Sequence, residues 1–254
     1  MLGLIVNASI CASIMLASLG FIIAMRGSED AGAQSKPTLY SFKLFWLLVG
    51  LLYFFEFVRI IAVYNGNFEI DKLLFELSII PFSLMSAPLV YFVVYLVKGS
   101  KSASTIFSLA VCVFGLCFSA LVFLTPLEPP TLTYWSSMYD IGDLFFPLYI
   151  SVLYILPILL IIGLLVVIIK RPIPKRIKYR ITLSLVAISL VLDFSLVDKI
   201  AQIPELQVAS RIFVLIGVVF AFLAYFPPMS IKERLEPPPH YDYEYEEEID
   251  EDRD

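Results

Sequence analysis

Charged residues are scarce in this sequence. Asp, Glu, Lys and Arg together make up 16% of the 254 residues, whereas hydrophobic residues make up 59% and the mean hydropathy is +0.87. A typical soluble domain is about 25% charged and about half apolar. A water-soluble monomer could not bury this much apolar surface, so the chain must lie partly in lipid. The composition therefore excludes a cytoplasmic enzyme, a nucleic-acid-binding protein and a secreted domain held together by disulfides.

Residue types that build metal and catalytic sites are also rare. The chain has one histidine, His240, and three cysteines, Cys11, Cys112 and Cys117, which all lie in long apolar runs. Cys112 and Cys117 are five residues apart, which is not a spacing of zinc ligands. The sequence contains no GxSxG, Walker A, CxxC or HExxH motif. We therefore expect no catalytic residue, no cofactor and no metal site, and we expect that the protein is not an enzyme.

Long apolar runs, by contrast, are abundant. A helix needs about 20 mostly apolar residues to cross a bilayer, and backbone at that depth must satisfy its own hydrogen bonds. Seven runs meet this length, so the sequence predicts an all-α, polytopic integral membrane protein with seven transmembrane helices. The runs are 2–25, 42–64, 73–97, 104–125, 144–169, 181–200 and 206–226. Pro81 and Pro88 in the third run, and Pro147 and Pro157 in the fifth, are expected to kink their helices.

The basic residues are divided unevenly between the loops. The first, third and fifth connectors and the segment after the last span hold thirteen Lys and Arg residues, whereas the other side holds at most four. Cytoplasmic loops of membrane proteins carry the excess of Lys and Arg. The distribution therefore predicts that the N-terminus lies outside and that the C-terminus lies in the cytoplasm, as in a multi-pass protein of the cell membrane.

The end of the chain differs in composition from the rest. Residues 242–254 hold nine acidic residues and one Arg, so this segment carries a charge of −8 while the remainder carries +3. Such a segment cannot bury a core and is typical of disorder. We therefore divide the chain into a transmembrane domain, 1–230, and a disordered acidic cytoplasmic tail, 231–254. The expected partners are the lipid bilayer and a cytoplasmic or membrane protein bound through the tail, with no nucleic acid; a solvated tail without a partner is the alternative.

Five ionisable residues of the predicted spans are candidates for a polar site, because an ionisable residue inside a span costs a few kcal/mol on insertion scales. They are Glu56, Arg59, Glu76, Asp193 and Arg211. Glu56 and Arg59 are three residues apart and share one helix face. The rise per residue places these two, Asp193 and Arg211 in one layer, about 20 to 24 Å above the cytoplasmic ends of the helices. Asp193 has no basic residue three or four positions away, so we expect it to face the bundle interior and to pair with Arg59 or Arg211.

This polar layer has two interpretations. The connector above it, 125–143, is long and acidic and includes Tyr134 and Trp135. A polar layer beneath such a loop is typical of an outward-facing ligand cavity. Alternatively, the layer is a structural ion-pair cluster that fixes the helix register, with Arg211 and Glu76 extending to the interface. Aromatic residues also gather at membrane interfaces without binding a ligand.

Three apolar segments resemble a known family. They are WLLVGLLYFFEFVRII in the second span, PLVYFVVYLVKG at the end of the third and LIGVVFAFLAYFPP at the end of the last. With seven spans and short loops, the sequence resembles the N-terminal seven-helix sensor domain of bacterial and archaeal membrane histidine kinases. In that family the last helix leads to a kinase or another output module, whereas this chain ends 28 residues after Phe226.

The resemblance implies a membrane sensor or receptor-like module without its own output domain, which relays its signal to a separate partner. Two alternatives from other classes stay open. One is a non-catalytic structural or accessory subunit of a larger membrane complex. The other is a small transporter, although the inner half of the spans holds few ionisable residues, which argues against ion coupling.

Overall fold

The helices that the sequence predicts are present in the computed structural model, which describes residues 2–25, 36–140, 145–170, 172 and 174–235. Seven helical segments in this part of the chain are long and apolar enough to cross a membrane, which confirms the prediction of an all-α, multi-pass membrane protein. The elements are α1 (Leu2–Ala24), α2 (Lys36–Tyr64), α3 (Phe68–Leu84), α4 (Ser86–Lys98), α5 (Lys101–Leu124), β1 (Thr131–Leu132), β2 (Ser137–Met138), α6 (Phe145–Lys170), α7 (Lys175–Ile200), α8 (Pro204–Tyr225) and α9 (Met229–Leu235).

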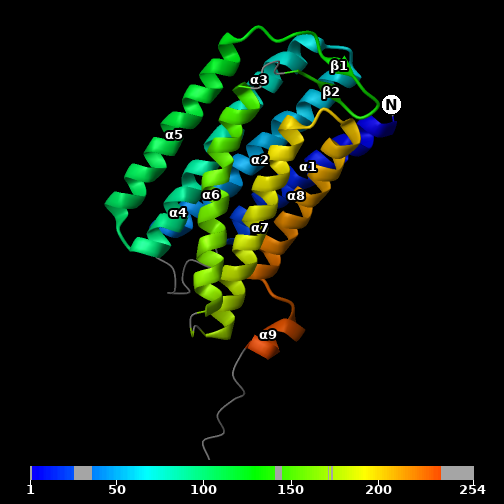
Figure 1. Cartoon of the computed structure of the whole chain (residues 1–254). Coiled ribbons are helices and arrows are strands. Elements are labelled where there is room, and N and C mark those ends of the chain that lie inside the picture. The colour runs from blue at the N-terminus through cyan, green and yellow to red at the C-terminus, as the bar shows by residue number, and fades with distance from the viewer. Residues whose placement is uncertain (1, 26–35, 141–144, 171, 173, 236–254) are drawn as a thin grey trace, which may run out of the picture.

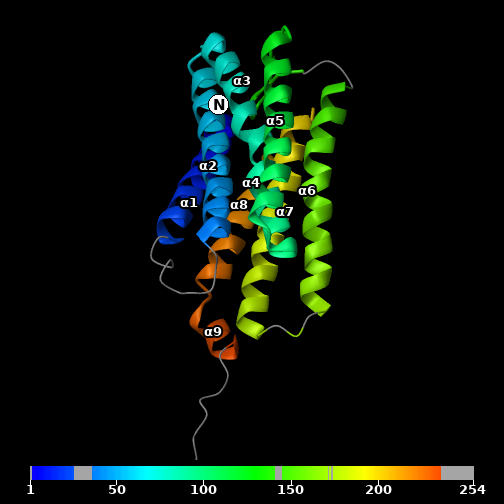
Figure 2. The same ribbon diagram turned by 90° about the vertical axis from the view of Figure 1, so that its left-hand side faces the viewer.

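The long helices run side by side as one bundle (Figures 1 and 2). Helix α1 packs against α2 and α8, α2 packs against α3 and α4, and α7 packs against α8 and α6. Helix α5 lies at the edge of the bundle, against α3 and α4 (Figure 1). The start of α1 and the two strands lie at one end, called here the hairpin end, whereas α9 lies beyond the other end, called here the tail end.

The third span consists of two helices that meet at Met85. Pro88 has no backbone N–H, so it cannot donate to the carbonyl four residues earlier, and the helix is interrupted there. Helix α5 approaches this break closely, because a Cβ on Gly115 would lie 2.6 Å from the Ser83 carbonyl oxygen. The fifth span differs, since α6 continues through Pro157 and has Pro147 in its first turn, where a missing N–H costs little.

The connector after α5 contains a small β-hairpin. Strands β1 and β2 are antiparallel, with Thr131 opposite Met138 and Leu132 opposite Ser137. The turn is closed by the Thr133 backbone N–H, which donates to the Ser136 carbonyl oxygen at 2.9 Å. The sequence predicts helices only, so this hairpin is an addition to the expected fold. It gives the backbone of a partly buried loop its hydrogen-bond partners.

The interior near the tail end is aromatic. Phe21 packs edge-to-face on Trp46, with ring centroids 5.4 Å apart, and Phe42 stacks on Tyr225 at 5.5 Å. Arg180 lies over the ring of Tyr225, with its Cζ 4.0 Å from the ring centroid. The hydrophobic core therefore continues to the tail end of the bundle.

The predicted domain boundary falls within α9. Residues 231–235, which we expected to be disordered, belong to this short helix. Residues 236–254, the rest of the predicted tail, lie outside the described residues, so the prediction of disorder stays a prediction there.

Candidate functional site

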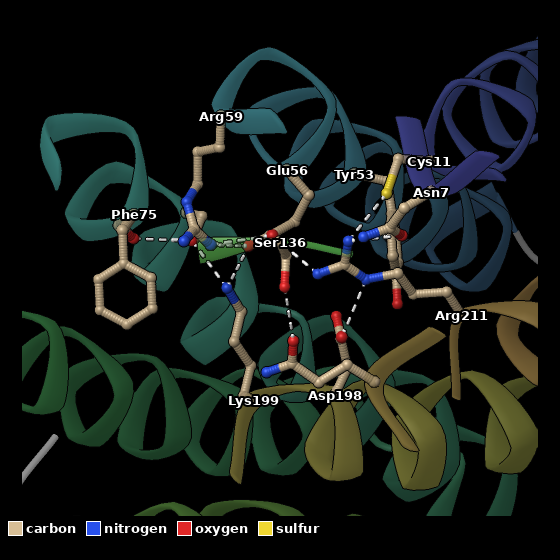
Figure 3. Close-up of polar contacts among 12 residues, drawn as sticks. Asn7, Cys11, Tyr53, Glu56, Arg59, Phe75, Ser136, Asp198, Lys199 and Arg211 are labelled. Carbon is tan, nitrogen blue, oxygen red and sulfur yellow. Dashed lines mark hydrogen bonds and ion pairs between the residues drawn. The ribbon is translucent and has the colours of Figure 1, made fainter. Parts of the chain in front are cut away.

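Six charged side chains meet inside the bundle near the hairpin end. They are called here the charge cluster and consist of Glu56, Arg59, Asp71, Asp198, Lys199 and Arg211. They come from α2, α3, α7 and α8, and each lies within about two helical turns of a helix end at the hairpin side. Figure 3 shows how five of them point toward one another.

Glu56 is the centre of this cluster and contacts all three cations. Its Oε1 accepts hydrogen bonds from Arg59 Nη1 at 3.0 Å and from Lys199 Nζ. Its Oε2 accepts from Arg59 Nη1 at 2.9 Å and from Arg211 Nη2 at 3.0 Å. The Glu56 residue is 1% exposed. A carboxylate this deeply buried is stable in its charged form only when cations surround it.

Each arginine also binds a second acid. Arg59 Nε donates to Asp71 Oδ1 at 3.0 Å, and Arg211 Nε donates to Asp198 Oδ1 at 2.9 Å. The cluster thus contains three carboxylates and three cations, and its formal charges cancel. Such balance is what burial requires, because an uncompensated charge in the interior is strongly unfavourable.

Neutral groups complete the coordination of the cations. Arg211 Nη1 donates to Asn7 Oδ1 at 3.0 Å and lies 3.3 Å from Cys11 Sγ, so α1 also belongs to the site. Lys199 Nζ donates to Ser78 Oγ at 2.9 Å. The three cations therefore connect α1, α2, α3, α7 and α8, which fixes the relative positions of these helices.

The hairpin covers the charge cluster and binds it directly. Arg59 Nη2 lies 3.3 Å from Ser137 Oγ, and the Tyr139 hydroxyl donates to Asp71 Oδ2 at 2.9 Å. The Tyr139 ring stacks on Phe75 with centroids 4.8 Å apart. Burial, followed by the neighbouring Asp71 carboxylate, raises the pKa of the Tyr139 phenol above its usual value of 10.0. The hydroxyl therefore stays protonated at neutral pH and can donate to Asp71.

Two further contacts hold the turn of the hairpin. Asn7 Nδ2 donates to the Trp135 carbonyl oxygen at 2.9 Å, and Ser136 Oγ donates to Gln207 Oε1 at 3.1 Å. The hairpin is thus bound to α1 and α8 as well as to α2 and α3. The position of the hairpin therefore depends on the first three helices of the chain and on α8, which lies more than 100 residues further along the sequence.

A cavity of about 630 Å³ lies between the charge cluster and the hairpin. One wall is polar and includes Glu56, Arg59, Asp198, Lys199 and Arg211. The other wall is apolar and comes from α3, α5 and α6; its residues are Phe75, Ile79, Phe118, Phe146 and Ile150. Small-molecule sites are typically concave, about 300 to 1,000 Å³ in volume, and largely apolar with a few polar groups. The cavity has these properties.

Three of the five residues that the sequence places in a polar layer meet in the structure: Glu56, Arg59 and Arg211. Asp193 and Glu76 lie outside the cluster. Asp193 is half-buried and accepts a hydrogen bond from Ser189 Oγ at 3.3 Å. The expected pairing of Asp193 with Arg59 or Arg211 is therefore wrong, because Arg59 binds Asp71 and Arg211 binds Asp198 instead.

The acids that take part lie five residues from the acids that the sequence pointed to. Asp198 follows Asp193 by five positions, and Glu76 follows Asp71 by five. Five residues turn an α-helix by about 140° relative to its starting face. Asp193 and Glu76 therefore lie on other faces of α7 and α3 than the two acids that bind the arginines.

Sequence reasoning missed Asp71, Asp198, Lys199 and Asn7 as members of the site. The predicted third span begins at residue 73, which leaves Asp71 in the connector before it. Asp198 and Lys199 fall in the last three residues of the predicted sixth span, 181–200, where a charge near the interface is unremarkable. A usable signal was present in α3, where Asp71, Phe75 and Ser78 follow the spacing of one helix face. A third predicted span that began one helical turn earlier would have included Asp71 on this face.

Within the described residues, no group of three or more His, Cys, Asp or Glu side chains is arranged to hold a metal ion. No known family model matches the sequence, and no curated protein matches it. The arrangement of the site itself, a charge-balanced polar wall facing an aromatic wall, is what indicates its chemistry. It can bind a small molecule through fixed hydrogen-bond donors and acceptors.

Proposed function

We propose that this protein is a receptor-like multi-pass protein of the cell membrane, which binds a small molecule in the cavity beneath the hairpin and relays that binding to a cytoplasmic partner. The observation that carries the proposal is the cavity of about 630 Å³ between the charge cluster and the aromatic wall. Its size and its mixed walls are typical of sites for small ligands.

The orientation is part of the proposal. The first, third and fifth connectors and the segment after the last span hold thirteen Lys and Arg residues, against at most four in the other connectors and nearby helix ends. The described helix ends that flank the first set lie at the tail end (Figure 1). The excess of basic residues marks the cytoplasmic side in membrane proteins. The hairpin and the cavity would then face the outside of the cell, and α9 and the acidic tail would face the cytoplasm.

The distribution of buried charge supports binding rather than transport. Among the described residues, the charged residues that are buried are Glu56, Arg59, Asp71, Asp198 and Arg211, and all belong to the charge cluster. The tail end is filled instead by aromatic and aliphatic side chains. A transporter of polar solutes needs polar groups along the whole path. A solute that leaves water loses its hydrogen bonds to water, and an apolar segment has no polar side chains to replace them.

Helices α7 and α8 provide the connection between the two ends. Asp198 and Lys199 on α7 and Arg211 on α8 contact the cavity, and the two helices pack against each other over their length. The start of α7 follows the basic connector, and α8 leads into α9. A ligand that changes the hydrogen bonds of these three side chains would shift the α7–α8 pair, which extends to the tail end.

The proposal is tested by a ligand screen on the purified full-length protein in detergent, with the melting temperature as readout. Compounds that stabilise the unaltered protein are then tested on Ile150→Trp, which fills the cavity, and on Ile155→Trp, which lies on the lipid-facing side of the same helix. Ile150 is 3% exposed and Ile155 is 50% exposed. We expect stabilisation of the unaltered protein and of Ile155→Trp but not of Ile150→Trp; equal stabilisation of both variants would contradict the proposed site.

A further inference from the structure

On the polar wall of the cavity, some hydrogen-bond donors and one acceptor are not used within the described part of the protein. Lys199 Nζ carries three hydrogens and donates to Glu56 and Ser78. Arg211 Nη2 carries two hydrogens and donates one of them, to Glu56. Asp198 binds Arg211 through Oδ1, and its Oδ2 accepts no hydrogen bond from any residue within the described ranges. A ligand on this wall can therefore bind through both a negative and a positive group.

The wall is also selective for ligands that carry both charges. Lys199 and Arg211 contact opposite oxygens of one carboxylate, that of Glu56, so an anion bound by these cations lies next to a negative charge. A cation bound by Asp198 likewise lies next to Arg211 and Lys199. Since the cluster itself is balanced, a ligand with a single charge adds an uncompensated charge to a buried site. A ligand with one charge of each sign adds none.

The opposite wall requires an apolar body. Phe118 packs edge-to-face on Phe146 with ring centroids 6.1 Å apart, and Ile150 lies on the same helix as Phe146. Phe75 connects the two walls, because its ring lies 5.2 Å from Lys199 Nζ and 4.8 Å from Arg59 Cζ. Burial of an apolar or aromatic group against these rings is favourable by about 25 cal/mol per Å².

We propose that the ligand is a zwitterion with an apolar body, of the class of the apolar α-amino acids. The carboxylate binds Lys199 and Arg211, the ammonium group binds Asp198, and the side chain lies against Phe118 and Phe146. This assignment rests on the proposed function, because it names the chemistry of the ligand for the same cavity.

The test uses four compounds on the unaltered protein, so no variant has to fold. L-Phenylalanine has both charges and an aromatic body, 3-phenylpropanoate lacks the ammonium group, 2-phenylethylamine lacks the carboxylate, and glycine lacks the aromatic body. Dissociation constants are measured by titration calorimetry in detergent. We expect L-phenylalanine to bind at least about tenfold more tightly than each of the other three.

The variant Asp198→Asn then tests whether Asp198 binds the ammonium group of the ligand. In Asp198→Asn, the preference for L-phenylalanine over 3-phenylpropanoate should fall toward one, while its preference over 2-phenylethylamine should persist. A singly charged analogue that binds as tightly as L-phenylalanine overturns the zwitterion assignment, and so does the absence of binding by all four compounds. Either result leaves the cavity itself to be judged by the Ile150→Trp and Ile155→Trp comparison, so the two proposals can fail separately.

Discussion

Arg211 Nη2 lies 3.0 Å from Glu56 Oε2, although 155 residues separate the two in the sequence. This contact joins α8 to α2 in the interior of the bundle. Glu56 also binds Arg59 and Lys199, so one carboxylate connects three helices through three cations. The stability of the hairpin end should therefore depend on Glu56 more than on any other single charge.

Replacing Glu56 by Gln should strongly destabilise the protein. The substitution keeps the size of the side chain but leaves three buried cations with two acids, and breaking a buried ion pair typically costs about 3 to 5 kcal/mol. The free energy of unfolding in detergent is the measurement. Glu76→Gln is the matched control, because Glu76 lies half-buried outside the cluster, and it should change stability by no more than about 0.5 kcal/mol. Similar losses in both variants would mean that Glu56 is not the centre of the cluster.

The partner of Arg211 on α7 can be identified by double-mutant cycles. Arg211→Gln combined with Asp198→Asn should show a coupling energy of about 1.5 to 3 kcal/mol, as for hydrogen bonds between charged groups. The same arginine variant combined with Asp193→Asn should show less than about 0.5 kcal/mol. A larger coupling to Asp193 than to Asp198 would reverse the assignment.

Tyr139→Phe should loosen the hairpin while keeping the ring stacked on Phe75. Loss of the hydrogen bond to the Asp71 carboxylate should cost about 1.5 to 3 kcal/mol of stability, as for other hydrogen bonds to charged groups. The raised pKa of Tyr139 also makes its contribution depend on pH. A group whose pKa is higher in the folded state stabilises fully below its unfolded pKa, here about 10, and its contribution is lost as the pH rises through the folded value.

The stability difference between the unaltered protein and Tyr139→Phe should therefore be constant up to about pH 10 and shrink above it. Melting temperatures across an alkaline pH series measure this difference. A difference that shrinks well below pH 10 would show that the phenol is not held by Asp71.

Orientation can be measured by labelling single cysteines in intact cells with a membrane-impermeant maleimide. Leu132→Cys lies in the hairpin, where Leu132 is 55% exposed, and Lys101→Cys lies at the other end of α5. We expect labelling of Leu132→Cys above the level of the unaltered protein, which controls for the native cysteines, and no added labelling of Lys101→Cys. The opposite pattern would invert the topology and place the cavity in the cytoplasm.

Deletion of residues 237–254 should leave the melting temperature in detergent nearly unchanged. The segment has no apolar periodicity and holds nine of the 23 acidic residues of the chain, so we expect it to contribute little to a packed core. A drop of many degrees would indicate that the tail packs against the basic residues at the tail end of the bundle.

The seven spans could be predicted from the sequence because length and hydropathy set them directly, and Glu56, Arg59 and Arg211 could be predicted from their depth alone. The direction of a side chain around its helix could not. Depth places Asp193 and Asp198 close together, but the five residues between them turn the helix by about 140°. The hairpin could not be predicted either, because its position depends on contacts such as that of Asn7 with Trp135, 128 residues away.

The proposed relay from the cavity to the tail end is tested most directly by hydrogen–deuterium exchange of the full-length protein, with and without a saturating cavity ligand. We predict slower exchange in the hairpin, residues 131–139, together with a changed rate in the first turns of α7 and in α9, at the opposite end of the bundle. Protection confined to the hairpin end, with the rates of α9 and of the start of α7 unchanged, would contradict a receptor function and leave a binding protein without relay.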